Sequence, residues 1–130
     1  MSSRALVTLD AVETKALLGT ARVGHLAYQS HRGLDVTPVN YRLCGDTIYI
    51  RTVADGTLAA LAPGPAAVAF LVTYLDRLSQ TGWSVKVRGK ISAVDETVEI
   101  PDVDPEPWTG LPGTMLLALT IDEMTGRRVG

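Results

Sequence analysis

Three segments rich in β-branched and aromatic residues follow one another closely in the first half of the chain. They cover residues 23–28, 36–43 and 47–53, and the polar connections between them contain Gly33 and Gly45. Such short connections predict antiparallel hairpins, because a parallel pair needs a crossover of about a dozen or more residues. The sequence therefore predicts an antiparallel meander and excludes a parallel sheet built from these segments.

Three further strands are predicted in the second half of the chain, over residues 66–75, 83–94 and 115–121. The first of these is apolar at almost every position, which is typical of a central strand covered on both faces. The second alternates, with Val85 and Val87 on one side and Lys86 and Arg88 on the other. This alternation predicts one buried face and one face that is wet or binds a charged group.

Two short helices complete the prediction. Asp10 is a suitable N-cap, Glu13 completes a capping box and Gly19 is a suitable stop, so residues 10–19 are expected to form a helix. Residues 56–62 form the second helix, which ends before a proline that cannot continue it.

The region after the alternating strand is expected to hold a helical turn over residues 95–100. A proline-rich loop is expected to follow over residues 101–112, ordered by Trp108. With about six or seven strands, the 130 residues predict one mainly β domain spanning 1–130. We expect a small antiparallel barrel with short flanking helices.

Composition removes several classes of function. The chain has 12 Lys+Arg and 14 Asp+Glu, for a net charge of -2, whereas nucleic-acid binding normally needs a basic excess. Cys44 is the single cysteine, and His25 and His31 are the only histidines, which is too few for a disulfide framework or a zinc site. The apolar residues 66–72 are too few to cross a bilayer. We therefore expect a cytoplasmic protein with neither a nucleic acid nor a membrane as partner.

A set of short motifs follows in order along the predicted strands: Pro38-Val39-Asn40-Tyr41, Arg51-Thr52, Gly56, Gly82-Trp83-Ser84-Val85 and Arg88-Gly89. This order resembles the pyridoxamine 5′-phosphate oxidase-like flavin-binding split-barrel family, from about residue 17 to residue 94. The late Gly126-Arg127-Arg128 is also typical of that family. The resemblance implies a homodimeric split β-barrel that binds FMN, or in some branches the deazaflavin F420, across the subunit interface.

The phosphate of such a cofactor needs a cation and hydrogen-bond donors. Arg51 ends a predicted strand just before a helix, so its guanidinium and the helix N-terminus could share one phosphate. The resemblance carries Arg51, Thr52 and Thr57 onto the phosphate-binding segment of the family. Family members commonly have Lys or Arg in place of Thr57, and losing that contact weakens phosphate binding by roughly 1.5–3 kcal/mol. The candidates to replace the missing cation are Arg88, Arg127 and Arg128.

The resemblance places the flavin ring along Pro38, Val39, Asn40 and Tyr41. Proline suits a strand edge or a bulge where a barrel opens, and residues 39–41 could then offer backbone groups to the pyrimidine edge of the ring. The alternative is that Pro38 only ends the hairpin pairing and that Tyr41 lies in the core.

The same resemblance brings Trp83 and Ser84 to the flavin of the opposite subunit, and Arg88 to the cofactor. Trp83 would shield the ring and Ser84 would bind its edge or the phosphate. The alternative for Trp83 is a tryptophan of the core or of the dimer interface. His25 is expected to be a structural strand histidine, and His31 an exposed turn residue.

Three functions follow from these residues. The first is an FMN-dependent oxidoreductase acting on an unknown small substrate, because no nucleophile–base pair is evident and any chemistry would be that of the cofactor. The second is an F420-binding reductase of the same fold, which would use Lys86, Arg88 and Lys90 along a groove. The third is a non-catalytic dimer that binds a flavin or another ligand. Oxidation of vitamin B6 itself is not expected, since the His/Arg pair that this activity needs near the C-terminus is missing.

Overall fold

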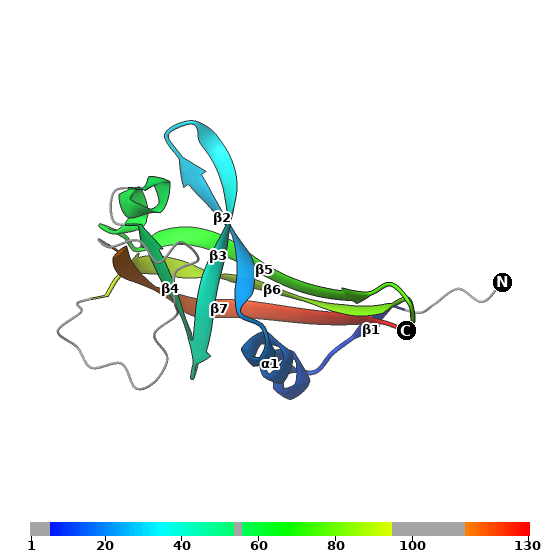
Figure 1. The fold of residues 1–130 in the computed structure, drawn as a ribbon. Helices are drawn as coiled ribbons and strands as arrows, with labels where there is room; N and C mark the ends of the chain where they lie inside the picture. Colours follow the sequence, from blue (N-terminus) through cyan, green and yellow to red (C-terminus); the bar gives the residue numbers. More distant parts are fainter. Residues whose placement is uncertain (1–5, 54–55, 95–113) are drawn as a thin grey trace.

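The computed structural model of the chain describes residues 6–53, 56–94 and 114–130, and antiparallel strands dominate it (Figure 1). The strands and helices of this part are β1 (Leu6–Thr8), α1 (Ala11–Thr20), β2 (Val23–Ser30), β3 (Gly33–Cys44), β4 (Thr47–Val53), the 3-10 helix η1 (Thr57–Leu61), β5 (Ala66–Asp76), β6 (Thr81–Ala93) and β7 (Thr114–Val129). The predicted meander is confirmed as β2, β3 and β4. Its second turn contains Gly45 with a φ of 61°, a left-handed conformation that favours glycine.

The sheet closes on itself. The strand order is β1-β7-β4-β3-β2-β5-β6, and β6 also pairs with β7, so that six strands form a ring and β1 lies outside it on β7. All of these pairings are antiparallel. The mainly β split-barrel class predicted from the sequence is confirmed.

The barrel is split because the length over which neighbouring strands pair differs greatly from one pair to the next. β2 meets β5 only from His25–Leu71 to Ala27–Ala69, whereas β5 pairs with β6 along its whole length. The outer parts of β5, β6 and β7 therefore continue past the ring as a flat extension, with β1 at its edge (Figure 1). We call this extension the terminal ribbon; it comprises residues 72–76, 81–88 and 121–129 together with β1.

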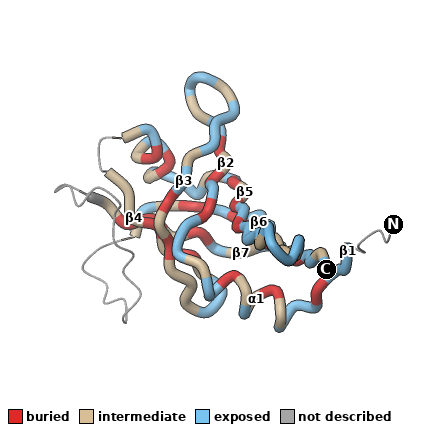
Figure 2. Tube along the Cα trace, turned by 45° about the vertical axis from the view of Figure 1, so that its right-hand side comes forward, coloured by how far each residue is buried: buried red, intermediate tan, exposed pale blue. Residues whose placement is uncertain are grey.

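Alternation along the strands fills the barrel. Val85, Val87 and Ile91 of β6 are buried, whereas the intervening Lys86 and Arg88 are exposed, as predicted (Figure 2). The largest fully buried side chains of the described part are Tyr41, Phe70, Leu18, Leu26, Ile48, Ile50, Ile91, Leu116, Leu117, Leu119, Val72 and Val85. Within the single chain β5 is covered on its core face only, because Leu71 and Leu75 are 40% and 69% exposed on the other side, so the cover expected there from a sheet or partner stays a prediction.

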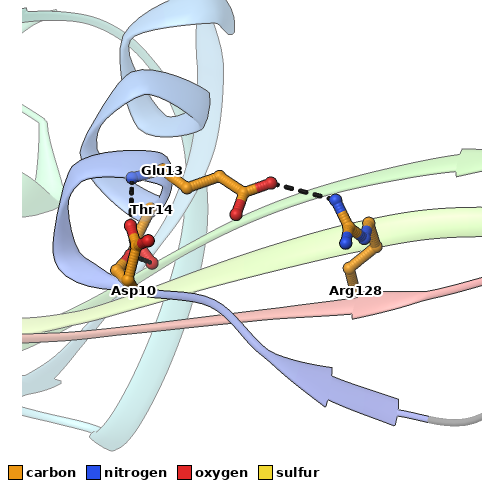
Figure 3. Close-up of polar contacts among 4 residues, drawn as sticks. All are labelled: Asp10, Glu13, Thr14 and Arg128. Carbon is orange, nitrogen blue, oxygen red and sulfur yellow. Dashed lines mark hydrogen bonds and ion pairs between the residues drawn. The ribbon is translucent and has the colours of Figure 1, made fainter.

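Helix α1 lies across the inner side of the terminal ribbon. The Asp10 carboxylate accepts from the backbone N–H of Glu13 at 2.8 Å, which confirms the predicted N-cap (Figure 3). The side chain of Glu13 accepts from Arg128 of β7 at 2.9 Å, a tertiary contact that the local capping-box prediction did not include. The helix continues past the predicted stop at Gly19 to Thr20, whose hydroxyl donates to the carbonyl of Leu17.

Other differences from the sequence prediction lie at the ends of the chain and in η1. Strand β1 was not predicted, and β7 continues to Val129 rather than ending at residue 121, so Gly126-Arg127-Arg128 belongs to a strand. The predicted second helix is a single 3-10 segment. The predictions for residues 95–100 and 101–112, including Trp108, lie outside the described residues.

A close contact between α1 and β7 gives a test of this packing. A Cβ atom added at Gly126 would overlap the side chain of Thr14, a buried polar residue whose hydroxyl donates to the carbonyl of Asp10. We expect Gly126→Ala to lower the free energy of unfolding by about 1–3 kcal/mol, measured by urea denaturation. In a double-mutant cycle, Thr14→Ala should relieve part of this loss, and strictly additive effects would contradict the contact.

Candidate functional site

The strands have an outer face, which points away from the barrel core, and half of the ten candidate residues lie on it. Residues directly opposite each other on antiparallel strands share a face, so the pairing register gives the neighbours. One row crosses five strands in the order Pro38, His25, Leu71, Lys86 and Thr125. The strand that was expected to support a flavin ring is thus continuous with the charged side of β6.

Arg51 and Asn40 are neighbours on this outer face. They stand directly opposite each other at the end of the β3–β4 pairing, and the next buried side chains on these strands, Tyr41 and Ile50, point inward. Thr52 follows Arg51 on β4 and therefore points to the opposite face. The structure brings together Arg51 and Asn40 of the predicted residues here, and it separates the side chain of Thr52 from them.

Strand β3 has a backbone edge beyond this pair. From Asn40 onward β3 pairs with β4, but before Asn40 its register partners in the described residues are on β2 alone. Pro38 lies in this one-sided stretch, opposite His25. The edge of β3 at residues 36–39 therefore offers backbone carbonyls to a ligand, whereas Pro38 has no N–H and the N–H of Val36 donates to the carboxylate of Asp35 at 2.8 Å.

The side chains of Val39 and Tyr41 point into the core, where Val39 is 6% and Tyr41 0% exposed. Tyr41 packs edge-on against Phe70, with ring centroids 5.0 Å apart, and its hydroxyl donates to the carbonyl of Leu18. Its backbone N–H donates to the carbonyl of Arg22. Of the two readings of Tyr41, the structure supports the core residue.

Thr57 lies beside the hairpin of β2 and β3. It lines a cavity of about 400 Å³ together with His31, Gly56 and Ala60. The expected contribution of a helix N-terminus is reduced here, because η1 is only five residues long and the N–H of Gly56 donates to the carbonyl of Val53. The hydroxyl of Thr57 is the polar side-chain group that this segment adds to the cavity.

Trp83 and Ser84 point to opposite sides of the terminal ribbon. Trp83 is half-buried and stacks on Tyr74, with ring centroids 6.3 Å apart. Ser84 lies on the outer face and lines a small groove with Lys86 and Arg127. Both residues also line a cavity of about 370 Å³ on the terminal ribbon, together with Tyr74 and Arg127.

Arg88 lines a hollow of about 540 Å³ between β2, β5 and β6. Lys90 and Asp122 lie in the same hollow and form an ion pair at 3.2 Å. No hydrogen bond or ion pair of Arg88 is present within the described residues. Arg88 is therefore accessible to a ligand, but it lines a different hollow from Thr57.

Two features of the site were missed from the sequence. His25 was expected to be a structural histidine, yet it is exposed on the outer face between Pro38 and Leu71. The grouping of Lys86 with Arg127 was also missed, because it depends on the pairing of β6 with β7. The exposure of His25 could have been predicted from the sequence, because residues alternate between the two faces of β2 and His25 falls on the face opposite Leu26 and Tyr28.

Residues 6–53, 56–94 and 114–130 contain neither a cluster of metal-ligating side chains nor a helix that could span a membrane. This part contains no group of three or more His, Cys, Asp or Glu side chains that could hold a metal ion. Nor does any of its helices have the length and apolar character that crossing a membrane requires.

Comparison with known proteins gives the family. The family model described as pyridoxamine 5′-phosphate oxidase matches residues 10–128. The chain belongs to this pyridoxamine 5′-phosphate oxidase family. The resemblance seen in the motif order is therefore confirmed, and the family fold covers almost the whole described structure.

Individual relatives of this oxidase-family chain are distant. An uncharacterised protein of Mycobacterium tuberculosis is 25% identical over 134 residues, covering 98% of this chain and 88% of that protein. A candidate pyridoxamine 5′-phosphate oxidase from Corynebacterium glutamicum has a TM-score of 0.81 at 22% identity, covering 99% of this chain and 96% of the other. An FAD-binding protein from Mycobacterium smegmatis has a TM-score of 0.73 at 24% identity, with 95% and 98% covered. These two structures share the fold.

Tyr41 gives a pH test of the packing beneath the site. Burial raises the pKa of Tyr41 to about 12, and the nearby Arg22 offsets part of this rise. The unfolded chain loses this proton near the ordinary value of 10.0, so the contribution of neutral Tyr41 is complete below that pH and declines up to about 12.

We expect Tyr41→Phe to destabilise the protein by about 1–3 kcal/mol at neutral pH, because the carbonyl of Leu18 loses its donor. This difference from the wild type should shrink between pH 10 and 12, as measured by urea denaturation at each pH. A difference that stays constant over this range would contradict the raised pKa.

Proposed function

We propose that this protein is a flavin-dependent oxidoreductase of the pyridoxamine 5′-phosphate oxidase family, acting as a homodimer that binds FMN at the subunit interface. The observation that carries the proposal is the pairing of Arg51 with Asn40 on the outer face, directly beside the one-sided edge of β3. The FAD-binding protein of the same fold supports a flavin as ligand. The substrate is a small molecule that reaches an open face of the ring.

The donor set around Arg51 fits a phosphorylated flavin. A guanidinium offers a fork of donors that matches phosphate oxygens, and an adjacent amide can bind the ribityl hydroxyls or the phosphate. Arg51 and Asn40 supply these two groups from neighbouring strands. Thr57, with a hydroxyl and no charge, would leave Arg51 as the principal cation for the phosphate in this part of the chain.

The edge of β3 fits the pyrimidine side of the ring. That side carries an N–H donor between two carbonyls, and the side of residues 36–39 that no described strand pairs with offers backbone carbonyls to this N–H. Pro38 makes this edge rigid and leaves a flat apolar surface against which a planar ring can stack. A bound flavin would supply two-electron transfer, while the protein would orient the ring and exclude water from one of its faces.

A dimer would cover apolar side chains that the single chain exposes. Tyr74, Leu75 and Leu78 near the β5–β6 turn are 56%, 69% and 98% exposed, and Leu34 on the β2–β3 arm is 88% exposed. Clusters of exposed apolar side chains on a protein surface commonly mark an interaction surface. A second subunit would also bring another Ser84 and Trp83 toward the Arg51 region, which the single chain does not do.

The phosphate contact is tested by binding FMN and riboflavin to the same variants. We expect Arg51→Ala to weaken FMN binding about tenfold or more, because one charge-assisted contact is lost, and to leave riboflavin binding unchanged. Fluorescence quenching during titration measures both affinities. F420, titrated in parallel, distinguishes the alternative deazaflavin cofactor.

Arg42→Ala is the matched control for this test. Arg42 lies on the neighbouring strand β3 and donates to the carbonyl of Tyr41, so its loss should not change the ratio of the two affinities. Equal FMN affinity in the wild type and Arg51→Ala would refute the proposed phosphate contact. Wild-type protein that binds neither FMN nor F420 would refute the proposed function.

The shared interface is tested by mixing two defective chains. Arg51→Ala removes the phosphate contact, and Ser84→Trp blocks the outer face of the ribbon. If each site takes Arg51 from one subunit and Ser84 from the other, a coexpressed mixture should regain about one quarter of the wild-type FMN sites. Sites built within one chain would give no recovery, and a monomeric wild type in light scattering would contradict the dimer directly.

A further inference from the structure

A small groove on the outer face of the terminal ribbon brings together two cations and two hydroxyl groups. It has a volume of about 110 Å³ and is lined by Ser84, Lys86, Thr125 and Arg127, with Leu71 as its apolar wall. Ser84 stands opposite Arg127, and Lys86 stands opposite Thr125. The two cations are therefore diagonal neighbours on adjacent strands, within reach of one small ligand.

All four polar side chains of the groove are without partners in the described chain. No hydrogen bond or ion pair of Ser84, Lys86, Thr125 or Arg127 side chains is found there. Lys15 and Lys90 are paired with Asp46 and Asp122, both at 3.2 Å. Lys86 and Arg127 have no such acidic partner in the described chain, and the groove brings these two cations to one small site.

Arg127 and Arg128 are adjacent on β7, so their side chains point to opposite faces of the terminal ribbon. Arg128 points toward α1 and contacts Glu13 at 2.9 Å (Figure 3). Arg127, the preceding residue on β7, must point to the other face and lines the groove. By register, the nearest acidic side chain on that face is Glu123. It stands opposite Arg88, in the outer-face pair that follows Lys86 and Thr125.

We propose that this groove binds a phosphate group. Two like charges on neighbouring strands repel each other unless an anion lies between them, and two hydroxyls can donate to the remaining oxygens of that anion. The guanidinium, ammonium and hydroxyl donors match the several acceptor oxygens of a phosphate better than the two of a carboxylate. The volume is that of one small anionic group and leaves the rest of a larger ligand to lie along the outer face.

The groove is separate within one chain from the phosphate contact proposed for Arg51. It lies on β6 and β7, whereas Arg51 lies on β4. Two sources of the phosphate are therefore possible: the second phosphate of a dinucleotide flavin, or a phosphate carried by another small molecule. The first source depends on the proposed flavin function, while the second does not.

The experiment uses the full-length protein stripped of any bound flavin. Inorganic phosphate and pyrophosphate are titrated at constant ionic strength, with chloride as the reference anion, and amide shifts of Ser84, Lys86, Thr125 and Arg127 are followed by NMR. We expect saturable shifts at these residues, and a tenfold or greater loss of affinity in Lys86→Gln/Arg127→Gln. Unchanged affinity in this variant, or no shifts in the wild type, would overturn the proposal.

Arg128→Gln is the matched control, because it removes the same charge from the next residue on the opposite face. Its phosphate affinity should stay within about twofold of the wild type, since the lost partner is Glu13 and not a ligand. An equal loss of phosphate affinity in Arg128→Gln and Arg127→Gln would indicate only a general charge effect and would overturn the proposed phosphate site. Glu123→Gln, which removes the nearest acid, should raise the affinity.

FMN and FAD separate the two sources of the phosphate. If Lys86→Gln/Arg127→Gln weakens FAD binding but not FMN binding, the groove holds the second phosphate of a dinucleotide flavin. If it weakens phosphate or pyrophosphate binding and neither flavin is affected, the groove serves a different phosphorylated molecule. Either result supports phosphate binding in the groove, and the second would stand even if the protein binds no flavin.

Discussion

The pairing of β7 with both β4 and β6 is the interaction on which the rest of the structure depends. Residues 114–120 of β7 pair with β4, while residues 117–129 pair with β6, so one strand joins the meander to the β5–β6 hairpin. This double pairing closes the ring and fixes which side chains of β6 point inward. It also leaves the last part of β7 free of β4, where α1 packs on Gly126 from one side.

The two sides of the terminal ribbon have different roles because of this closure. Its inner side is occupied by the chain itself, through Thr14 against Gly126 and Glu13 with Arg128. On its outer side, Lys86 and Arg127 have no partner within the described residues. Since the same strands make both sides, the charge available to a ligand is set by register and not by the overall net charge of -2.

The candidate site was predictable in part. The strand positions and the order of motifs were enough to find the family, and Asn40 and Arg51 do lie together. The motif resemblance treated the residues of one motif as a group, although adjacent residues of a strand point in opposite directions. Tyr41 and Trp83 both follow this rule and lie on the inner side. The exposure of His25 was predictable from the same alternation and was overlooked.

The sequence by itself determined the local elements of this protein. Short glycine-containing turns required antiparallel hairpins, alternation along β6 separated a buried face from a charged one, and Asp10 began α1. Only the tertiary structure decided the closure of β7 on β6, the extension of β7 to Val129 and the meeting of Lys86 with Arg127. Pairing between strands far apart in the chain depends on a register that neither strand contains alone. The outer groove exists only once that register is set.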